Sequence, residues 1–265
     1  MIPAVLSVAG SDPSGGAGLQ SDIKTVHAHG CYALAAPSLL TVQSTQGVQA
    51  VQLLEAALVR AQLDCLLRDV SPAAAKTGAL GSAAVVVEIA ALARQTDFPW
   101  VVDPVFLPTT GASLAEPGLV EAMRDALLPE AALVTPNTSE AGALAQMQVR
   151  SLQDAREAAT RIASLGARAV LVKGGHLPDD SRGTDLLLAE GEFHELAPSA
   201  RLSQVPHGTG CALSAAIASR LARGETLLNA VSSAKVWLTA VSERAFALGQ
   251  GALVLDQFPR LPDQS

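Results

Sequence analysis

The chain has 265 residues, of which 49% are hydrophobic and 16% charged, enough apolar content to bury a large core and too little charge for a disordered chain. Its formal net charge is −7, and no window carries the cluster of Lys and Arg that sequence-independent binding to nucleic acid requires. The most apolar stretch, residues 83–93, is well short of the ~20 residues that a membrane span needs, so we expect neither a nucleic-acid partner nor a membrane partner.

Short β-branched runs alternate along the chain with stretches rich in alanine and leucine, which is typical of an α/β protein with a mainly parallel sheet. In chain order the pattern predicts a strand over Ala4–Ala9, a loop over Gly10–Gly18, a helix over Leu19–His29, strands over Trp100–Asp103 and Ala132–Val134, a helix over Ser151–Leu165, a strand over Ala169–Val172 and a helix over Cys211–Arg223. Each predicted strand ends in a polar or glycine-containing turn. In open parallel sheets the ligand binds at such turns, so we look for chemistry there.

The chain has no internal repeat, low-complexity linker or charge block, so we expect one domain over residues 1–265. Its three cysteines, Cys31, Cys65 and Cys211, are widely separated and form no C-x-x-C pair. This pattern excludes a disulfide scaffold and a zinc ribbon, and it fits the reducing cytoplasm, where we expect the protein to be located.

The first turn, residues 9–18, reads A-G-S-D-P-S-G-G-A-G and joins a predicted strand to a helix. Its glycines allow the backbone to approach a ligand closely. The turn has neither the lysine of a Walker A loop nor the G-x-G-x-x-G spacing of a dinucleotide site. We expect Asp12 and Asp22 to hydrogen-bond a polar substrate, because carboxylates repel phosphate; the alternative is a flexible turn without a ligand.

A second turn, His207-Gly-Thr-Gly-Cys211, comes immediately before the last predicted helix. Gly208 and Gly210 free the backbone, so that consecutive N–H groups around Thr209 can point at one spot, where the helix N-terminus adds its partial positive charge. We therefore predict an anion hole for a phosphoryl group in transfer. The same field is expected to lower the pKa of the Cys211 thiol, whose thiolate would accept a proton from an attacking hydroxyl. The alternative is that Cys211 is a small buried hydrophobe.

Oxygen ligands and a lysine follow two further predicted strands. Asn137 and Glu140, three residues apart, project to one side of a first helical turn and suit Mg²⁺, which commonly takes only one or two protein carboxylates. A capping box with Glu140 near its third position is an alternative that is compatible with metal binding. Lys173 would meet a polyphosphate, unless it is an ordinary surface lysine. Asp103 adds one more carboxylate at a strand end.

Seven short segments carry these residues: 9–25 (AGSDPSGGAGLQSDIKT), 41–48 (TVQSTQGV), 76–78 (KTG), 102–105 (VDPV), 135–141 (TPNTSEA), 173–176 (KGGH) and 207–214 (HGTGCALS). In their order and spacing they resemble the hydroxymethylpyrimidine/phosphomethylpyrimidine kinases of thiamine synthesis, a branch of the ribokinase-like superfamily. The resemblance covers about residues 4–240. Any one of the segments is a weak signal, and seven together are a specific one.

The resemblance implies a three-layer α/β/α ribokinase-like fold with a mainly parallel central sheet. It also implies transfer of the γ-phosphoryl group of ATP, with Mg²⁺, to 4-amino-5-hydroxymethyl-2-methylpyrimidine and then to its monophosphate. By motif position it implies these roles: Asp22, Gln43 and Gly10 for the pyrimidine; Gly208, Thr209 and Gly210 for the anion hole, with Cys211 as the base; Asn137 and Glu140 for Mg²⁺ and phosphate; and Lys173 and Lys235 for the nucleotide. Relatives further imply a homodimer.

Three departures from the family pattern bear on the substrate. The family's A-K-S-G reads Leu107-Pro-Thr-Thr-Gly111 here, K-I-G-M reads Lys76-Thr-Gly-Ala79, and the G-x-G-P-V-x-H segment is replaced by residues 249–256. Two alternatives follow. One is a pyridoxal/pyridoxine kinase, because the small Ala79 would admit a different ring substituent. The other is a non-catalytic protein that binds a vitamin precursor.

Overall fold

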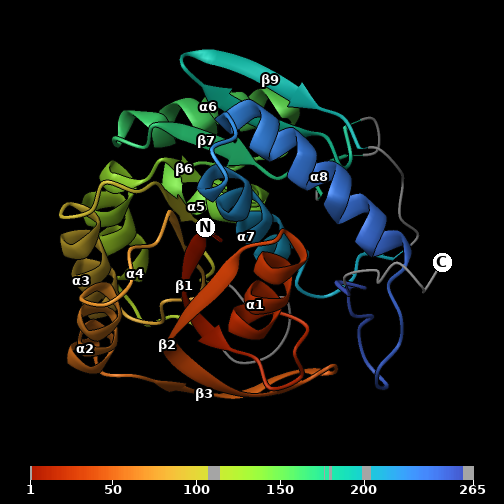
Figure 1. The fold of residues 1–265 in the computed structure, drawn as a ribbon. Coiled ribbons are helices and arrows are strands. Elements are labelled where there is room, and N and C mark those ends of the chain that lie inside the picture. The colour runs from red at the N-terminus through yellow and green to blue at the C-terminus, as the bar shows by residue number, and fades with distance from the viewer. Residues whose placement is uncertain (1, 107–113, 176, 179–180, 199–203, 259–265) are drawn as a thin grey trace.

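The computed structural model describes residues 2–106, 114–175, 177–178, 181–198 and 204–258 of the chain; the segment 107–111 and His176, named above, lie outside them. Within the described residues, one sheet of nine strands crosses the molecule, and helices cover both of its faces (Figure 1). This is the three-layer α/β/α arrangement that the sequence predicted. In the same part of the chain no helix is both long and apolar enough to cross a lipid bilayer.

The sheet is parallel through its middle and antiparallel at both edges. The strands are β1 (Ala4–Ser11), β2 (Tyr32–Ser44), β3 (Gly47–Leu53), β4 (Ala74–Thr77), β5 (Trp100–Val102), β6 (Leu133–Val134), β7 (Ala169–Val172), β8 (Asp185–Ala189) and β9 (Glu192–Leu196). Their order is β3-β2-β1-β4-β5-β6-β7-β8-β9, and every pair from β2 to β7 is parallel. β3 at one edge and β8 and β9 at the other pair antiparallel. The carboxyl ends of the parallel strands therefore share one edge of the sheet.

The helices divide between two layers. One layer contains α1 (Gly18–Ala28), α7 (Thr209–Ala222) and α8 (Leu227–Glu243). The other contains α2 (Ala56–Leu67), α3 (Ala83–Ala93), α4 (Leu119–Ala122), η1 (Met123–Leu127), η2 (Leu128–Glu130), α5 (Thr138–Ala145) and α6 (Leu152–Ser164). In Figure 1 the first layer lies to the right of the sheet, and α2, α3 and α4 lie to its left.

Alternate residues of the central strands pack into two separate cores. Leu6 and Val8 of β1 pack into the core beneath α2 to α6, whereas Val5 packs into the core beneath α1, α7 and α8. In β7, Val170 and Leu171 divide in the same way. Because both faces of these parallel strands are covered, nearly every residue in them is apolar, and the strands appear in the sequence as continuous hydrophobic runs.

Two helices follow the sequence closely and a third differs at its start. Ser151 caps α6 by accepting a hydrogen bond from the amide of Asp154 at 3.1 Å. The apolar stretch 83–93 is α3, which buries six of its residues and leaves Val87 exposed. The predicted start of α7 at Cys211 was wrong: the helix begins at Thr209, because Gly208 adopts a left-handed conformation (φ 82°) and serves as its N-cap.

Candidate active site

The first turn of α7 packs directly against the loop that follows β1. At Gly208 an added Cβ would lie 1.9 Å from the carbonyl oxygen of Gly16, so only glycine fits. Thr209, Gly210 and Cys211 are the first three residues of α7, and amides at these positions have no acceptor within the helix. The predicted anion hole therefore has free backbone donors at the positive end of a helix dipole.

The loop after β1 is held together by its own carboxylate. One oxygen of Asp12 accepts hydrogen bonds from the amide (2.9 Å) and hydroxyl (2.7 Å) of Ser14, and the other accepts from the amide of Ala17 at 2.8 Å. Burial raises the pKa of Asp12, but the nearby His207 and these donors outweigh it, so the pKa is lowered. Asp12 organises the loop, contrary to the expectation that its carboxylate is free for a substrate.

Asp22 is fully buried in an ion pair. Its two oxygens lie 3.0 and 2.9 Å from Nζ of Lys76, which is itself fully buried, and the hydroxyl of Ser7 donates to Asp22 at 2.6 Å. Burial lowers the pKa of Lys76, but the combined attraction of Asp22, Cys211 and Asp103 outweighs it, and the pKa is raised. Because all these donors point at the carboxylate, we assign the pair as charged. The structure does not present Asp22 to a pyrimidine, because both of its oxygens are engaged and it has no exposed surface.

Gln43 and Gly10, the other residues expected at the ring, lie on either side of the same loop. Nε2 of Gln43 lies 3.0 Å from Nε2 of His207 and so links β2 to the segment that leads into α7. An added Cβ on Gly10 would lie 2.6 Å from Leu39 Cδ1 and 3.7 Å from Ala79 Cβ. Gly10 thus permits close packing between β1 and β2, and the small Ala79 lies beside it.

Asp103, which the sequence suggested only as an additional carboxylate, lies at the centre of the polar cluster. It is fully buried and lies 2.8 Å from Nζ of Lys173, while Ser214 of α7 donates to it at 3.4 Å. An added Cβ on Gly210 would lie 3.1 Å from Lys173 Nζ and 3.8 Å from Oδ2 of Asp103. Burial lowers the pKa of Lys173, but the combined attraction of Asp103, Glu140 and Cys211 outweighs it, and the pKa is raised. A permanent positive charge therefore lies at the first turn of α7.

The capping box at the start of α5 is confirmed. The side chain of Asn137 accepts from the amide of Glu140 at 2.9 Å, and Glu140 accepts from the amide of Asn137 at 2.7 Å. Burial raises the pKa of Glu140 to about 7, opposed by Lys173, 3.9 Å away, and reinforced by Asp103. The described residues hold no cluster of three or more His, Cys, Asp or Glu that suits a metal ion. Mg²⁺ needs only one or two protein carboxylates when phosphates supply other ligands, so Glu140 fits this role, whereas the side-chain oxygen of Asn137 is used by the cap.

The sulfur of Cys211 lies at the N-termini of two helices. It occupies the third position of α7 and accepts a hydrogen bond from the amide of Gly18, the first residue of α1. The prediction of a lowered thiol pKa was nevertheless wrong. Burial raises the pKa of Cys211 to about 11, because the opposing effect of Lys76 is smaller and Asp22 and Asp103 add to the increase. Desolvation thus outweighs the field of the helix termini.

Lys235 of α8 ties its helix to the turn after β7. Its Nζ lies 2.6 Å from Asp185 and donates to the carbonyl oxygen of Gly183 at 2.8 Å. The other oxygen of Asp185 accepts from the amide of Gly174, next to Lys173, at 2.9 Å. Lys235 therefore supports the backbone beside Lys173 through Asp185, and its place near a nucleotide stays a prediction.

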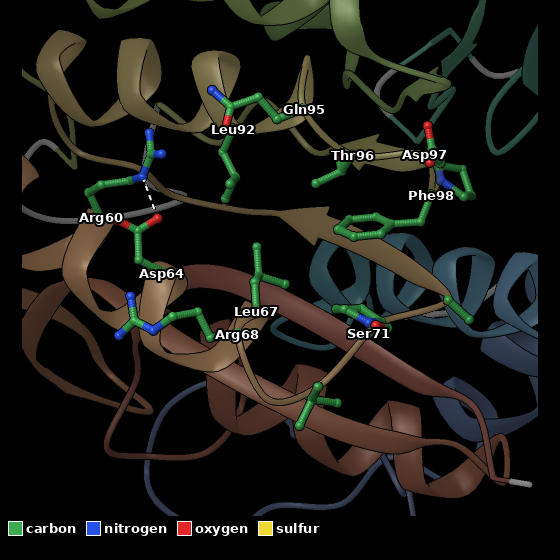
Figure 2. Close-up of a pocket in the computed structure, with 14 residues that line it drawn as sticks. Arg60, Asp64, Leu67, Arg68, Ser71, Leu92, Gln95, Thr96, Asp97 and Phe98 are labelled. Atoms are coloured by element: carbon green, nitrogen blue, oxygen red, sulfur yellow. Dashed lines mark hydrogen bonds and ion pairs between the residues drawn. The ribbon is translucent and has the colours of Figure 1, made fainter.

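A cavity of about 750 Å³ lies away from this cluster, at the amino ends of β4 and β5 (Figure 2). The ion pair between Arg60 and Asp64 (2.7 Å) lies at one end of the lining shown in Figure 2, and Phe98 lies toward the other. Ligands of parallel sheets bind at the carboxyl ends of the strands, so this cavity is separate from the polar cluster around Asp103.

Comparison with known proteins assigns the chain to a family. A family model described as phosphomethylpyrimidine kinase matches residues 12–256. The chain belongs to this family. It is 38% identical over 257 residues to the hydroxymethylpyrimidine/phosphomethylpyrimidine kinase of Synechococcus elongatus, and the match covers 97% of this chain and 98% of that protein. The family of the chain is therefore one of phosphotransferases, as its motifs predicted.

The chain is also similar to a longer bifunctional protein and to a pyridoxal kinase of known structure. The chain is 43% identical over 250 residues to a thiamine biosynthesis bifunctional protein of Geobacter sulfurreducens; the match covers 94% of this chain and 51% of that protein, so the chain spans about half its length. Among solved structures, the pyridoxal kinase from Staphylococcus aureus in complex with pyridoxal has a TM-score of 0.89 at 32% identity, covering 97% of this chain and 94% of that chain. The predicted fold is confirmed by this similarity.

Proposed function

We propose that the protein transfers the γ-phosphoryl group of ATP, with Mg²⁺, to the hydroxymethyl group of 4-amino-5-hydroxymethyl-2-methylpyrimidine and then to the resulting monophosphate. The kinase family supports the reaction. One observation supports its location: Lys173, paired with Asp103, lies beside Gly210 in the first turn of α7, where the backbone amides have no acceptor within the helix. Binding of the precursor alone would not need such an anion hole.

Phosphoryl transfer requires alignment and charge neutralisation more than covalent chemistry. In the proposed step the hydroxymethyl oxygen attacks the γ-phosphorus, the bond from the γ-phosphorus to its bridging oxygen breaks, and ADP leaves. The hydroxyl proton passes to the thiolate of Cys211. The amides of residues 209–211 and the ammonium of Lys173 stabilise charge on the transferred group. Bound Mg²⁺, held through Glu140, would neutralise phosphate charge.

The ring is proposed to lie against Gln43 and the backbone near Gly10, between the loop after β1 and α7. Asp22 lies beneath this site without an oxygen free for the substrate. In the second phosphorylation the attacking atom is a phosphate oxygen of the monophosphate, which is already ionised near neutral pH and has no proton to give to Cys211.

A panel of acceptors tests the proposal. ADP release is measured with hydroxymethylpyrimidine, its monophosphate, pyridoxal and pyridoxine, each at saturating ATP and Mg²⁺. We expect turnover with the first two compounds. The similarity to pyridoxal kinase and the small Ala79 beside Gly10 favour pyridoxal or pyridoxine as the second candidate substrate, and preference for either would replace the pyrimidine. Tight ring binding with no ADP release above the blank would favour a binding protein.

We further propose that the protein acts as a homodimer in the cytoplasm. Support for the dimer comes from apolar side chains exposed on one face of β2, where Leu40 is 45% and Val42 58% exposed. Support for a reducing compartment comes from Cys31, Cys65 and Cys211, all of which are free thiols.

A further inference from the structure

The ion pair of Lys76 and Asp22 has no evident role in the stability of the fold. Both side chains have 0% exposure, and the other buried residues of their strand and helix carry no charge. Removing two charges from water costs several kcal/mol each, and apolar residues of similar volume are often as stabilising as a buried pair. A fully buried lysine and aspartate at this position therefore require another explanation.

The first turn of α1 connects the pair to the sulfur of Cys211. Gly18, the first residue of α1, donates its amide to the sulfur, and Asp22 lies four residues later on the same face of the helix. Lys76 points toward the carboxyl end of β4, since a Cβ on Gly78 would lie 3.2 Å from its Nζ. β4 also packs against α7, the helix that carries Cys211.

Four charged groups act on the thiol from the elements around it. Lys76 of β4 favours the thiolate, whereas Asp22 of α1 and Asp103, which follows β5, oppose it. Lys173, which follows β7, also interacts with Cys211, but it is paired with Asp103 at 2.8 Å. The charge of Lys76 is the largest influence that offsets burial of the sulfur.

We propose that Lys76 is a positioning residue for phosphoryl transfer: its buried ammonium stabilises negative charge on Cys211, and Asp22 holds the ammonium in place while attenuating its effect. This assignment rests on the proposed function, because it gives Cys211 the role of proton acceptor. The acceptor hydroxyl gives its proton to the thiolate, and Lys76 neither loses nor gains one.

The test measures the thiol directly, without substrates. In a Cys65→Ser background, which removes the exposed cysteine on α2, alkylation of Cys211 by iodoacetamide is followed from pH 7 to 10.5 by peptide mass spectrometry. Because the pKa of Cys211 is about 11, alkylation over this range follows its small thiolate fraction, and Lys76→Met should slow it severalfold at each pH. Asp22→Asn should speed alkylation over the same range. The double variant should fall between the two.

The opposite signs separate an electrostatic role from a structural one. If Lys76 and Asp22 only maintained packing, both single variants would loosen the site and change reactivity in the same direction, which would overturn the proposal. An unchanged alkylation rate in both would do the same. Circular dichroism and thermal unfolding identify any variant that does not fold. If Lys76→Met is lost in this way, Asp22→Asn, which retains a hydrogen-bond acceptor for Lys76, decides the question alone.

Activity is the second measurement. In folded Lys76→Met, kcat for the first phosphorylation should fall by at least tenfold at pH 8 with KM for ATP little changed, and the loss should stay constant from pH 7 to 9, where the thiol is mostly protonated in both proteins. An unchanged kcat together with slower alkylation of Cys211 would overturn the role in transfer. If the acceptor panel shows a different substrate or none, the proposed function fails, whereas the alkylation result stands independently of it.

Discussion

Burial raises the pKa of the Cys211 thiol and of the Glu140 carboxyl group, and this decides how Cys211 should behave. With its pKa raised to about 11 by burial, the thiolate fraction rises about tenfold for each pH unit over the whole neutral range. A reaction that needs the thiolate should therefore gain rate with pH, and the logarithm of kcat/KM should rise with a slope near one from pH 6.5 to 9. A flat profile over this range would count against Cys211 as the proton acceptor.

Substitution of the same residue gives a second prediction. Cys211→Ala should lower kcat for the first phosphorylation by roughly 10²–10⁴, the usual range for loss of general acid–base catalysis. It should lower the second phosphorylation much less, because the attacking phosphate oxygen carries no proton. Cys65→Ala, at an exposed position on α2, is the matched control and should retain full activity. Equal losses in both phosphorylations would assign Cys211 to binding.

The ionised carboxyl group of Glu140 lowers the stability of the fold, and the same group is proposed to hold Mg²⁺. Because burial raises its pKa from 4.5 to about 7, the folded protein prefers the protonated acid, and stability is lost as the pH rises through this interval. Glu140→Gln keeps the cap and has no carboxyl group to ionise. Its free energy of unfolding, measured in urea titrations, should therefore rise relative to that of the wild type by about 1–3 kcal/mol as the pH increases from 4.5 to 8. The same variant should need more Mg²⁺ for half-maximal rate; an unchanged Mg²⁺ titration would remove Glu140 from the metal site.

At the scale of elements, α7 is flanked by two left-handed glycines that differ in their surroundings. A Cβ added to Gly208 (φ 82°), at the start of α7, would lie 1.9 Å from the carbonyl oxygen of Gly16. A Cβ added to Gly224 (φ 84°), at the end of the helix, would have no atom within 4 Å. Gly224→Ala should cost only the backbone strain, about 1 kcal/mol. Gly208→Ala must also push the loop after β1 away, so it should cost at least about 2 kcal/mol more and abolish ADP release.

Thermal unfolding and ADP release of the two variants, measured side by side, check this comparison. Equal stabilities with full activity in both would show that the contact between α7 and the loop after β1 is not required.

At the scale of the whole molecule, the antiparallel edge formed by β2 and β3 is the candidate surface for self-association. Val42 on β2 is 58% exposed, and Val87 on α3, which lies away from this edge, is 51% exposed. Because their exposures are similar, Val87 is a matched control for Val42. Val42→Glu should shift a dimer to monomer in sedimentation experiments, because a charge there would be buried between subunits. Val87→Glu should leave the association unchanged. A monomeric wild-type protein, or equal effects of the two changes, would refute the proposed dimer.

The sequence alone determined the alternation of strands and helices, the capped start of α6 and the glycine-rich turn at 207–211, since these depend on local propensity and short-range hydrogen bonds. It also carried the motifs that assigned the kinase family. The long β2–β3 hairpin and α8 were not predicted.

Only the tertiary structure decided which polar groups meet and which remain free. Lys76 pairs with Asp22 across 54 residues of chain, and Lys173 with Asp103 across 70. No local pattern indicates such partners, so Asp22 was expected to face a substrate, and Asp103 was noted only as an additional carboxylate. The protonation of Cys211 depends in the same way on burial, because the helix N-termini evident in the sequence favour a thiolate, whereas the desolvation that outweighs them arises only when α1, β4 and α7 pack together.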